Sequence, residues 1–298
     1  MSKLNLSELT KNNFVTEFNP PIEKLIASGL IQRPNVNGLY SVETKTIKNY
    51  HRNTILGQGR ADFSTSLEGL SATQRVDLYC FYYFQMHFTS SFLLFSSEQA
   101  FIESAISGKD VYFVDIGCGP FTSGYAFNTW LSKLENKNFK TCNYIGVDTS
   151  QAMLDKAKKI FNNLGVNKYD SSVFHTDKNF IADGLHSMIN NSSDTIFIIN
   201  YSYLFASLSL NVDDFVSFTN TILTKFCNKN GGKLIVLQQN PEYSSLNLKW
   251  HSYKQKLTTL QTKENYPKSI AIQFDDVLGS CNWASPNLNI MCDLIKSF

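Results

Sequence analysis

Two glycines and an acid occur together where a short apolar run meets a longer helical one. The run VYFVDI is followed at once by GCGPFTSG, so Asp115 lies near the end of the run and Gly117 and Gly119 follow it. A glycine has no side chain, so the backbone there can turn sharply and approach a ligand closely. In a doubly wound sheet, a nucleotide-like ligand approaches the turn between the first strand and its helix. The segment therefore predicts a ligand-binding turn, with Asp115 directed into a crevice.

A second acid, Asp148, ends the apolar run NYIGVD about thirty residues later. An acid at the end of the second strand is the expected partner of the two ribose hydroxyl groups in this architecture. A G-x-G pair alone is weak evidence. A strand, a D-x-G-x-G loop, a helix, a second strand and a terminal acid, in that order, form a much stronger pattern. We therefore predict a cofactor crevice formed by residues 115–121 and Asp148.

Apolar runs of strand length alternate with helix-length stretches from about residue 109 onward. The runs are apolar on both faces, as expected of parallel strands covered by helices on two sides. The predicted strands are residues 111–116, 143–148, 172–175, 195–200 and 233–238, with a possible edge pair at 269–274 and 289–295. The predicted helices are residues 121–135, 151–164, 212–228 and 243–260. This alternation predicts an α/β fold with a Rossmann-like doubly wound sheet of about seven strands.

The first 105 residues differ, because short amphipathic segments are interrupted at NPP, RPN and GQG. In SATQ, Ser71 and Gln74 have the spacing of a capping box, which predicts the start of a helix that continues through an aromatic run. We predict an N-terminal helical cap, residues 1–105, and a domain that contains the sheet, residues 106–298.

The segments VDIGCGP, YIGVDTSQAML and GGKLIVLQ together resemble the class I S-adenosylmethionine-dependent methyltransferase family, over about residues 109–298. The resemblance implies a methyltransferase of the EC 2.1.1 class that uses S-adenosyl-L-methionine and releases S-adenosyl-L-homocysteine. It implies that the D-x-G-x-G loop holds the methionine part of the cofactor, that the acid after the second strand holds the ribose, and that a residue after the third strand contacts the adenine. The predicted cofactor-binding residues are Asp115, Gly117, Cys118, Gly119, Pro120, Asp148, Thr149, Asp177, Asn200 and Arg60.

The glycine loop departs from two common patterns. Thr122 stands where the dehydrogenase pattern G-x-G-x-x-G has its third glycine, and Phe121 stands where the family pattern D-x-G-x-G-x-G has its last one. Pro120 and Phe121 make the loop stiffer and bulkier, so it would either shield the cofactor or bind it more weakly. Gly124 is the residue that would restore a close approach of the following helix.

The segment NYSYLFAS follows the fourth predicted strand, where the family commonly presents a catalytic or substrate-orienting group. Asn200 would accept a hydrogen bond from a target amine, and Tyr201 would stack on a planar substrate. These two residues are the predicted catalytic groups. In the alternative, Asn200 caps the strand, and Tyr201 and Tyr203 only pack.

The four arginines of the chain all precede residue 76: Arg33, Arg52, Arg60 and Arg75. A planar guanidinium group holds a carboxylate with two parallel hydrogen bonds, which a lysine does not do. We therefore expect the cap to bind the carboxylate of the cofactor, with Arg60 as the first candidate and Arg75 as the second. The alternatives are a solvated Arg60 and a carboxylate held by backbone amides of the glycine loop.

Some side chains have both a structural and a functional interpretation. His87 would be either a general base beside the crevice or a hydrogen-bonded residue in an aromatic interface. The aromatic cluster at residues 79–84 would be either core or a substrate cage. The lysines of the stretch 156–159 are expected to be solvated.

Composition narrows the class of function. Apolar residues make up 43% of the chain, charged residues 17%, and the net charge is +2. The chain should therefore fold, and it lacks the strongly basic balance of a dedicated nucleic-acid-binding module. No metal site is expected, because the six cysteines form no C-x-x-C pair and no histidines have ligand spacing. The polar start and the short apolar runs predict a cytoplasmic protein without a membrane segment.

Together these observations predict in-line methyl transfer to a small molecule or a protein side chain. The alternatives are an RNA or DNA methyltransferase and a non-catalytic protein that binds S-adenosylmethionine. The sequence leaves the acceptor atom and the oligomeric state open.

Overall fold

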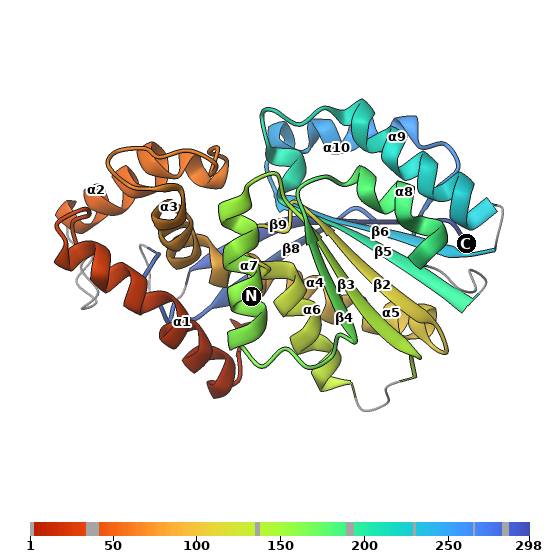
Figure 1. Ribbon diagram of the computed structural model, residues 1–298, viewed down its shortest axis with the longest axis horizontal. Helices are drawn as coiled ribbons and strands as arrows, with labels where there is room; N and C mark the ends of the chain where they lie inside the picture. Colours follow the sequence, from red (N-terminus) through yellow and green to blue (C-terminus); the bar gives the residue numbers. More distant parts are fainter. Residues whose placement is uncertain are drawn as a thin grey trace.

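One twisted sheet runs through the larger part of the molecule, with helices on both of its faces (Figure 1). The computed structural model describes residues 3–33, 42–134, 138–188, 194–228, 231–264, 266–281 and 286–298. The strands of the sheet lie in the order β1-β8-β9-β6-β5-β2-β3-β4, and β7 pairs with β9. Their bounds are β1 Lys3–Leu4, β2 Asp110–Ile116, β3 Thr141–Val147, β4 Ser171–His175, β5 Thr195–Ser202, β6 Lys233–Pro241, β7 Gln261–Thr262, β8 Lys268–Phe274 and β9 Asn287–Lys296.

The predicted Rossmann-like fold is confirmed by the directions of these strands. Strands β4, β3, β2, β5 and β6 are parallel to one another, whereas β9 is antiparallel to both β6 and β8. The last two predicted strands therefore pair as expected. They do not end the sheet, however, because β1 adds a short parallel strand beyond β8.

The order of winding places a ligand crevice at one end of the sheet. Strand β2 has β3 on one side and β5 on the other, so the chain reverses its direction of winding between them. In open α/β sheets, ligands bind outside the carboxyl ends of the strands at such a switch point. The predicted glycine loop follows β2 at this end of the sheet.

Two layers of helices bury the two faces of the sheet. Alternating strand residues point to opposite faces, so Phe113 packs in one core cluster and Val114 in the other. One face is covered by α4 Gln85–Ser97, α5 Gln99–Ile106, α6 Thr122–Lys133 and α7 Gln151–Asn163. The other is covered by α8 Asn179–Met188, α9 Val212–Ile222 and α10 Ser244–Lys256. The predicted helices correspond to α6, α7, α9 and α10, with α9 continuing as a π-helical stretch, Leu223–Asn228, to the predicted end; α8 was not predicted.

The cap lies beside the carboxyl ends of the strands and is helical, as predicted (Figure 1). It contains α1 Glu8–Ala27, α2 Val42–Tyr50, α3 Ala72–Tyr79 and two π-helical stretches, His51–Ile55 and Cys80–Phe84. Ser71 and Gln74 form both hydrogen bonds of the predicted capping box.

The predicted interruption at the sequence NPP is wrong. Helix α1 continues through Pro20 and Pro21, although each proline removes a backbone donor. The buried rings of Phe14 and Phe18 and the side chain of Ile22 anchor the helix on both sides of the prolines, so packing maintains it. The predicted interruption at RPN lies largely outside the described residues.

Contacts cross the predicted domain boundary at residues 105/106. Helix α4 packs along α6 and against β6 and β9, so it belongs to the helical layer of the sheet. A buried ion network also joins the cap to α7, because Lys156 Nζ lies 3.0 Å from Glu17 Oε1 and 3.2 Å from Asp77 Oδ1. The expectation that the lysines of α7 are solvated is therefore wrong for Lys156, whereas Lys158 is exposed.

Candidate functional site

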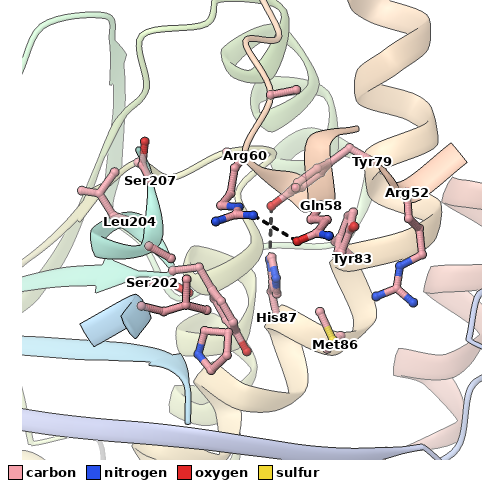
Figure 2. A pocket seen from close by; sticks show the side chains of 18 of the residues that line it. Arg52, Gln58, Arg60, Tyr79, Tyr83, Met86, His87, Ser202, Leu204 and Ser207 are labelled. Carbon is pink, nitrogen blue, oxygen red and sulfur yellow. Dashed lines mark hydrogen bonds between the residues drawn. The ribbon is translucent and has the colours of Figure 1, made fainter. Parts of the chain in front are cut away.

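A cavity of about 1100 Å³ lies between the cap and the carboxyl ends of the strands. The glycine loop and Asp148 line it from the side of the sheet, and the loop after β5 contributes Tyr203 and Leu204. The cap contributes residues 58–63 (Figure 2). One side of the aromatic helix, which is the continuous helical stretch from α3 through residues 80–84 into α4, also lines the cavity. The sequence-predicted loop, the second acid and the cap thus meet around one space.

The glycine loop is held in shape by its own backbone. Gly117 and Gly119 both have left-handed backbone angles, with φ of 71° and 52°. The amides of Gly117 and Cys118 donate to the carbonyl oxygen of Val147 at 2.7 and 2.9 Å, which ties the loop to the end of β3. A β-carbon on Gly119 would meet no atom within 4 Å, so its open side faces the cavity that it lines.

Asp148 lies where the sequence places the ribose-binding acid. Its Oδ2 accepts a hydrogen bond from the Gly119 amide at 3.0 Å, and its Oδ1 accepts one from the Ser150 amide at 2.9 Å. Burial raises the pKa of the Asp148 carboxyl, while these two amide hydrogen bonds oppose the rise. Thr149, its exposed neighbour, also lines the cavity. The carboxylate is therefore oriented by the loop and lies in the cavity wall.

Asp115 has a different position from the one predicted, because its side chain does not line the cavity. It shares the buried face of β2 with Phe113, beneath α6. Its carboxyl oxygens accept hydrogen bonds from Asn200 Nδ2 at 2.8 Å and Tyr144 OH at 3.3 Å. Burial raises the pKa of Asp115 to about 7, although these contacts and the Gly124 amide oppose the rise. Asp115 thus joins β2, β3, β5 and the first turn of α6 behind the loop.

The two predicted catalytic residues do not line the cavity either. Asn200 is fully buried and is paired with Asp115 on the adjacent strand. Tyr201 points to the opposite face of the sheet, where its ring packs on Phe205 and Tyr253. Successive strand residues alternate between faces, so the two side chains cannot act together on one substrate. The packing interpretation describes Tyr201, and Asn200 serves as the partner of Asp115.

The remaining predicted loop and strand residues also lie outside the cavity wall. Cys118 and Pro120 are buried on the inner side of the glycine loop. Asp177 is exposed, and its carboxylate accepts the amide of Asn179 at 2.9 Å, at the start of α8. The structure therefore gives Asp177 a helix-capping role.

The arginines of the cap have three different environments. Arg60 lines the cavity and donates to Gln58 Oε1 at 3.0 Å. Arg75 is buried and donates to the carbonyl oxygens of Asp62, Thr65 and Ile55, so its guanidinium group is committed to the loop backbone. Arg33 is exposed and pairs with Glu23. The second candidate for the cofactor carboxylate, Arg75, is therefore a structural residue.

The sequence analysis did not identify Arg52 as a site residue, although the structure places it in the cavity wall. Its guanidinium group lies 5.3 Å from the centre of the Tyr83 ring. The signal in the sequence was the confinement of all four arginines to the cap. Which of them reach the cavity depends on the folded path of residues 50–65.

The aromatic helix presents Tyr79, Tyr83 and His87 to the cavity. His87 Nδ1 lies 3.1 Å from the hydroxyl oxygen of Tyr79, and its ring stacks on Tyr203 at 3.9 Å between ring centres. Burial lowers the pKa of His87 to about 3, so the imidazole is neutral near pH 7. These three side chains therefore form an aromatic interface and line the cavity at the same time. Phe84, from the same predicted aromatic cluster at residues 79–84, packs in the core.

The described part of the chain contains neither a cluster of metal ligands nor a membrane-spanning helix. Within it, no group of three or more His, Cys, Asp or Glu side chains is placed to hold a metal ion. None of its helices combines the length and the apolar character needed to cross a membrane.

Comparisons with known proteins give similar solved structures. No protein-family model and no curated protein sequence matches this chain. A methyltransferase from Aquifex aeolicus that depends on S-adenosylmethionine is 13% identical over 67% of this chain and 89% of its own, with a TM-score of 0.38. A putative class I methyltransferase from Listeria monocytogenes is 14% identical over 97% of this chain and 88% of its own, with a TM-score of 0.39. The YcgJ protein of Bacillus subtilis is 15% identical over 67% and 97%, with a TM-score of 0.38.

Proposed function

We propose that this protein is an S-adenosylmethionine-dependent methyltransferase that acts on a small molecule. The observation that carries the proposal is the junction of Gly119 and Asp148. An open glycine and an oriented carboxylate lie side by side in the cavity wall, at the switch point of the sheet. This is the arrangement that a ribose-containing cofactor requires.

The cavity also suits the other parts of this cofactor. Asp148 can accept hydrogen bonds from both ribose hydroxyl groups through its two oxygens. Arg60 lines the same cavity from the cap and can pair with the cofactor's carboxylate (Figure 2). The amides of Gly117 and Cys118 are already bonded to Val147, so the loop offers fewer donors for that carboxylate than the sequence alone suggests. When bound, the cofactor supplies an electrophilic methyl group on a sulfonium sulfur.

The cap favours a small acceptor over a macromolecule. Small-molecule sites typically have volumes of about 300–1,000 Å³, and this cavity of about 1100 Å³ has room for a cofactor and a small partner. Residues 58–63 and the aromatic helix cover it from the side of the cap. Such a cover excludes water and holds two reactants together, which can supply most of the rate of a methyl transfer.

Calorimetry with S-adenosylhomocysteine tests the cofactor assignment. Asp148→Ala should weaken binding by about 1.5 to 3 kcal/mol, the range for hydrogen bonds to a charged group. Asp177→Ala is the matched control: it removes an exposed carboxylate that follows the neighbouring strand and lies outside the cavity. Its affinity should equal that of the unmodified protein.

Two results would contradict the proposal. One is an intact fold that binds neither S-adenosylmethionine nor S-adenosylhomocysteine while it binds a nicotinamide dinucleotide. The other is an equal loss of affinity in the Asp148 and Asp177 variants, which would mean that the cofactor does not bind in this cavity.

A further inference from the structure

The wall of the cavity contains a second set of side chains around Arg52. Arg52 lines the cavity from the cap beside Tyr83 and Met86, and His87 lies on their other side (Figure 2). Arg60 lies on the other side of Tyr83 in this view, closer to Leu204 and the sheet. The two arginines therefore line one cavity and lie on different sides of Tyr83 in this view.

Neither cavity arginine is neutralised by an acid of the described chain. Among the described residues, Arg33 is the arginine that forms an ion pair, with Glu23. Arg52 and Arg60 have no described carboxylate within 4.0 Å. Arg52 is half-buried, so its charge is partly removed from solvent. A cofactor with one carboxylate accounts for one guanidinium group, and the proposed function assigns that role to Arg60. The charge of Arg52 remains for a second anion.

The surroundings of Arg52 favour a flat ligand. Its guanidinium group lies over the Tyr83 ring, and His87 lies between Tyr83 and Tyr203 with interplanar angles of 27° and 21°. Met86 adds a polarizable thioether to the same wall. These rings cover one another's faces, so an aromatic ligand would meet their edges, in the edge-to-face arrangement that aromatic pairs favour, and the methionine sulfur. A guanidinium group binds a carboxylate with two parallel hydrogen bonds.

We propose that Arg52, Tyr83, Met86 and His87 form the acceptor subsite and that the acceptor is a planar aromatic carboxylate. This inference rests on the proposed function, because it assigns Arg60 to the cofactor. Arg52 supplies the charge that recognises the acid group. The edges of the stacked rings and the Met86 thioether supply the apolar contact that orients the acceptor in the cavity.

The test measures binding by the full chain saturated with S-adenosylhomocysteine. The probes are 4-hydroxybenzoate and 2-naphthoate, each with its uncharged amide, and cyclohexanecarboxylate as a charged acid without a planar ring. At least one aromatic acid should bind ten times more tightly than its amide and than cyclohexanecarboxylate. Arg52→Gln should remove this preference while it changes the affinity for S-adenosylhomocysteine by less than twofold.

Two further variants complete the design. Arg52→Lys keeps the charge without the planar fork and should retain part of the preference, and it also serves if Arg52→Gln does not fold. Arg33→Gln removes an exposed arginine outside the cavity and should bind every probe as the unmodified protein does.

The outcomes separate the subsite from the cofactor assignment. If S-adenosylhomocysteine binds but no acid binds more tightly than its amide, the subsite is wrong and the proposed function stands. If Arg52→Gln weakens S-adenosylhomocysteine instead of the acids, both arginines bind the cofactor and the subsite is again wrong. If S-adenosylhomocysteine does not bind and the unliganded chain binds the acids with the predicted preference, the residues around Arg52 form an aromatic-acid site, but it is not an acceptor subsite and the proposed function fails.

Discussion

The ring of Phe121 packs directly on Gly124, where an added β-carbon would lie 2.2 Å from Phe121 Cε2. Phe121 has a left-handed backbone, with φ of 71°, and its buried ring contacts Tyr144 and Phe161 in the core. The unusual residue of the glycine loop is therefore turned away from the cavity. It neither covers the ligand space nor reduces it, and Gly124 is the residue that makes room for it.

This contact predicts that Gly124→Ala is destabilising although alanine is a better helix former. The new methyl group would overlap the rings of Phe121 and Tyr144, and overpacking of a core typically costs about 1–3 kcal/mol. Urea denaturation measures the loss. In the variant with both Phe121→Ala and Gly124→Ala, the loss should be smaller than the sum of the two single losses, because the ring is no longer there to overlap. Additive losses would mean that the two residues do not interact.

The buried carboxyl group of Asp115 predicts a stability that falls as the pH rises. Burial raises its pKa from an ordinary 3.8 to about 7. Between these two values the folded protein holds the proton and the unfolded chain has lost it. The stabilising contribution is therefore complete below about pH 4 and is lost as the pH rises through about 7.

Comparison with Asp115→Asn isolates this contribution. Between pH 5 and 8, the free energy of unfolding of the unmodified protein should fall relative to that of the variant, by an amount on the order of a few kcal/mol. Burial lowers the pKa of His51 to about 4 and that of His87 to about 3. Both histidines therefore reduce the free energy of unfolding of the protein as the pH falls below 6.5. These histidines are present in both proteins, so the difference cancels them. Parallel profiles would show that Asp115 stays ionised in the folded protein.

We expect Arg75, in the core of the cap, to affect ligand binding in the cavity through the loop that it holds. Its guanidinium group donates to three carbonyl oxygens between Ile55 and Thr65, at 2.7 to 2.9 Å. Arg75→Gln should leave buried acceptors without donors, at a cost of about 1–3 kcal/mol each. Limited proteolysis should then cut this loop faster, and affinity for S-adenosylhomocysteine should fall because the loop carries Arg60. A normal cleavage rate together with lost affinity would instead indicate direct contact between Arg75 and the cofactor.

We expect the buried ion pairs of Lys156, which join α7 to the cap, to contribute strongly to the free energy of unfolding. It is buried against the carboxylates of Glu17 and Asp77, and removal of one member of a buried ion pair typically costs about 3–5 kcal/mol. Lys156→Met should lower the free energy of unfolding by this amount. Lys158→Met, an exposed lysine on the same helix, should change it by less than about 0.5 kcal/mol. Equal effects would mean that the network contributes little.

The sequence by itself determined the seven longer strands, the glycine loop and Asp148, but not the two-residue strands β1 and β7. Local rules govern these features: apolar runs form buried strands, glycine permits the left-handed backbone of residues 117 and 119, and the end of a parallel strand opens onto the crevice. The capping box at Ser71 is equally local, because its two hydrogen bonds join residues three apart.

Only the tertiary structure decided which chemically capable side chains reach the cavity. Asp115 and Asn200 have suitable groups at suitable strand ends, but the packing of α6 on their face buries them as a pair. Arg52, Arg60 and Arg75 are close in sequence, and the folded path of residues 50–65 directs two of them to the cavity and one to backbone carbonyls. These choices depend on contacts between residues far apart in the chain, so residue type and local spacing do not encode them.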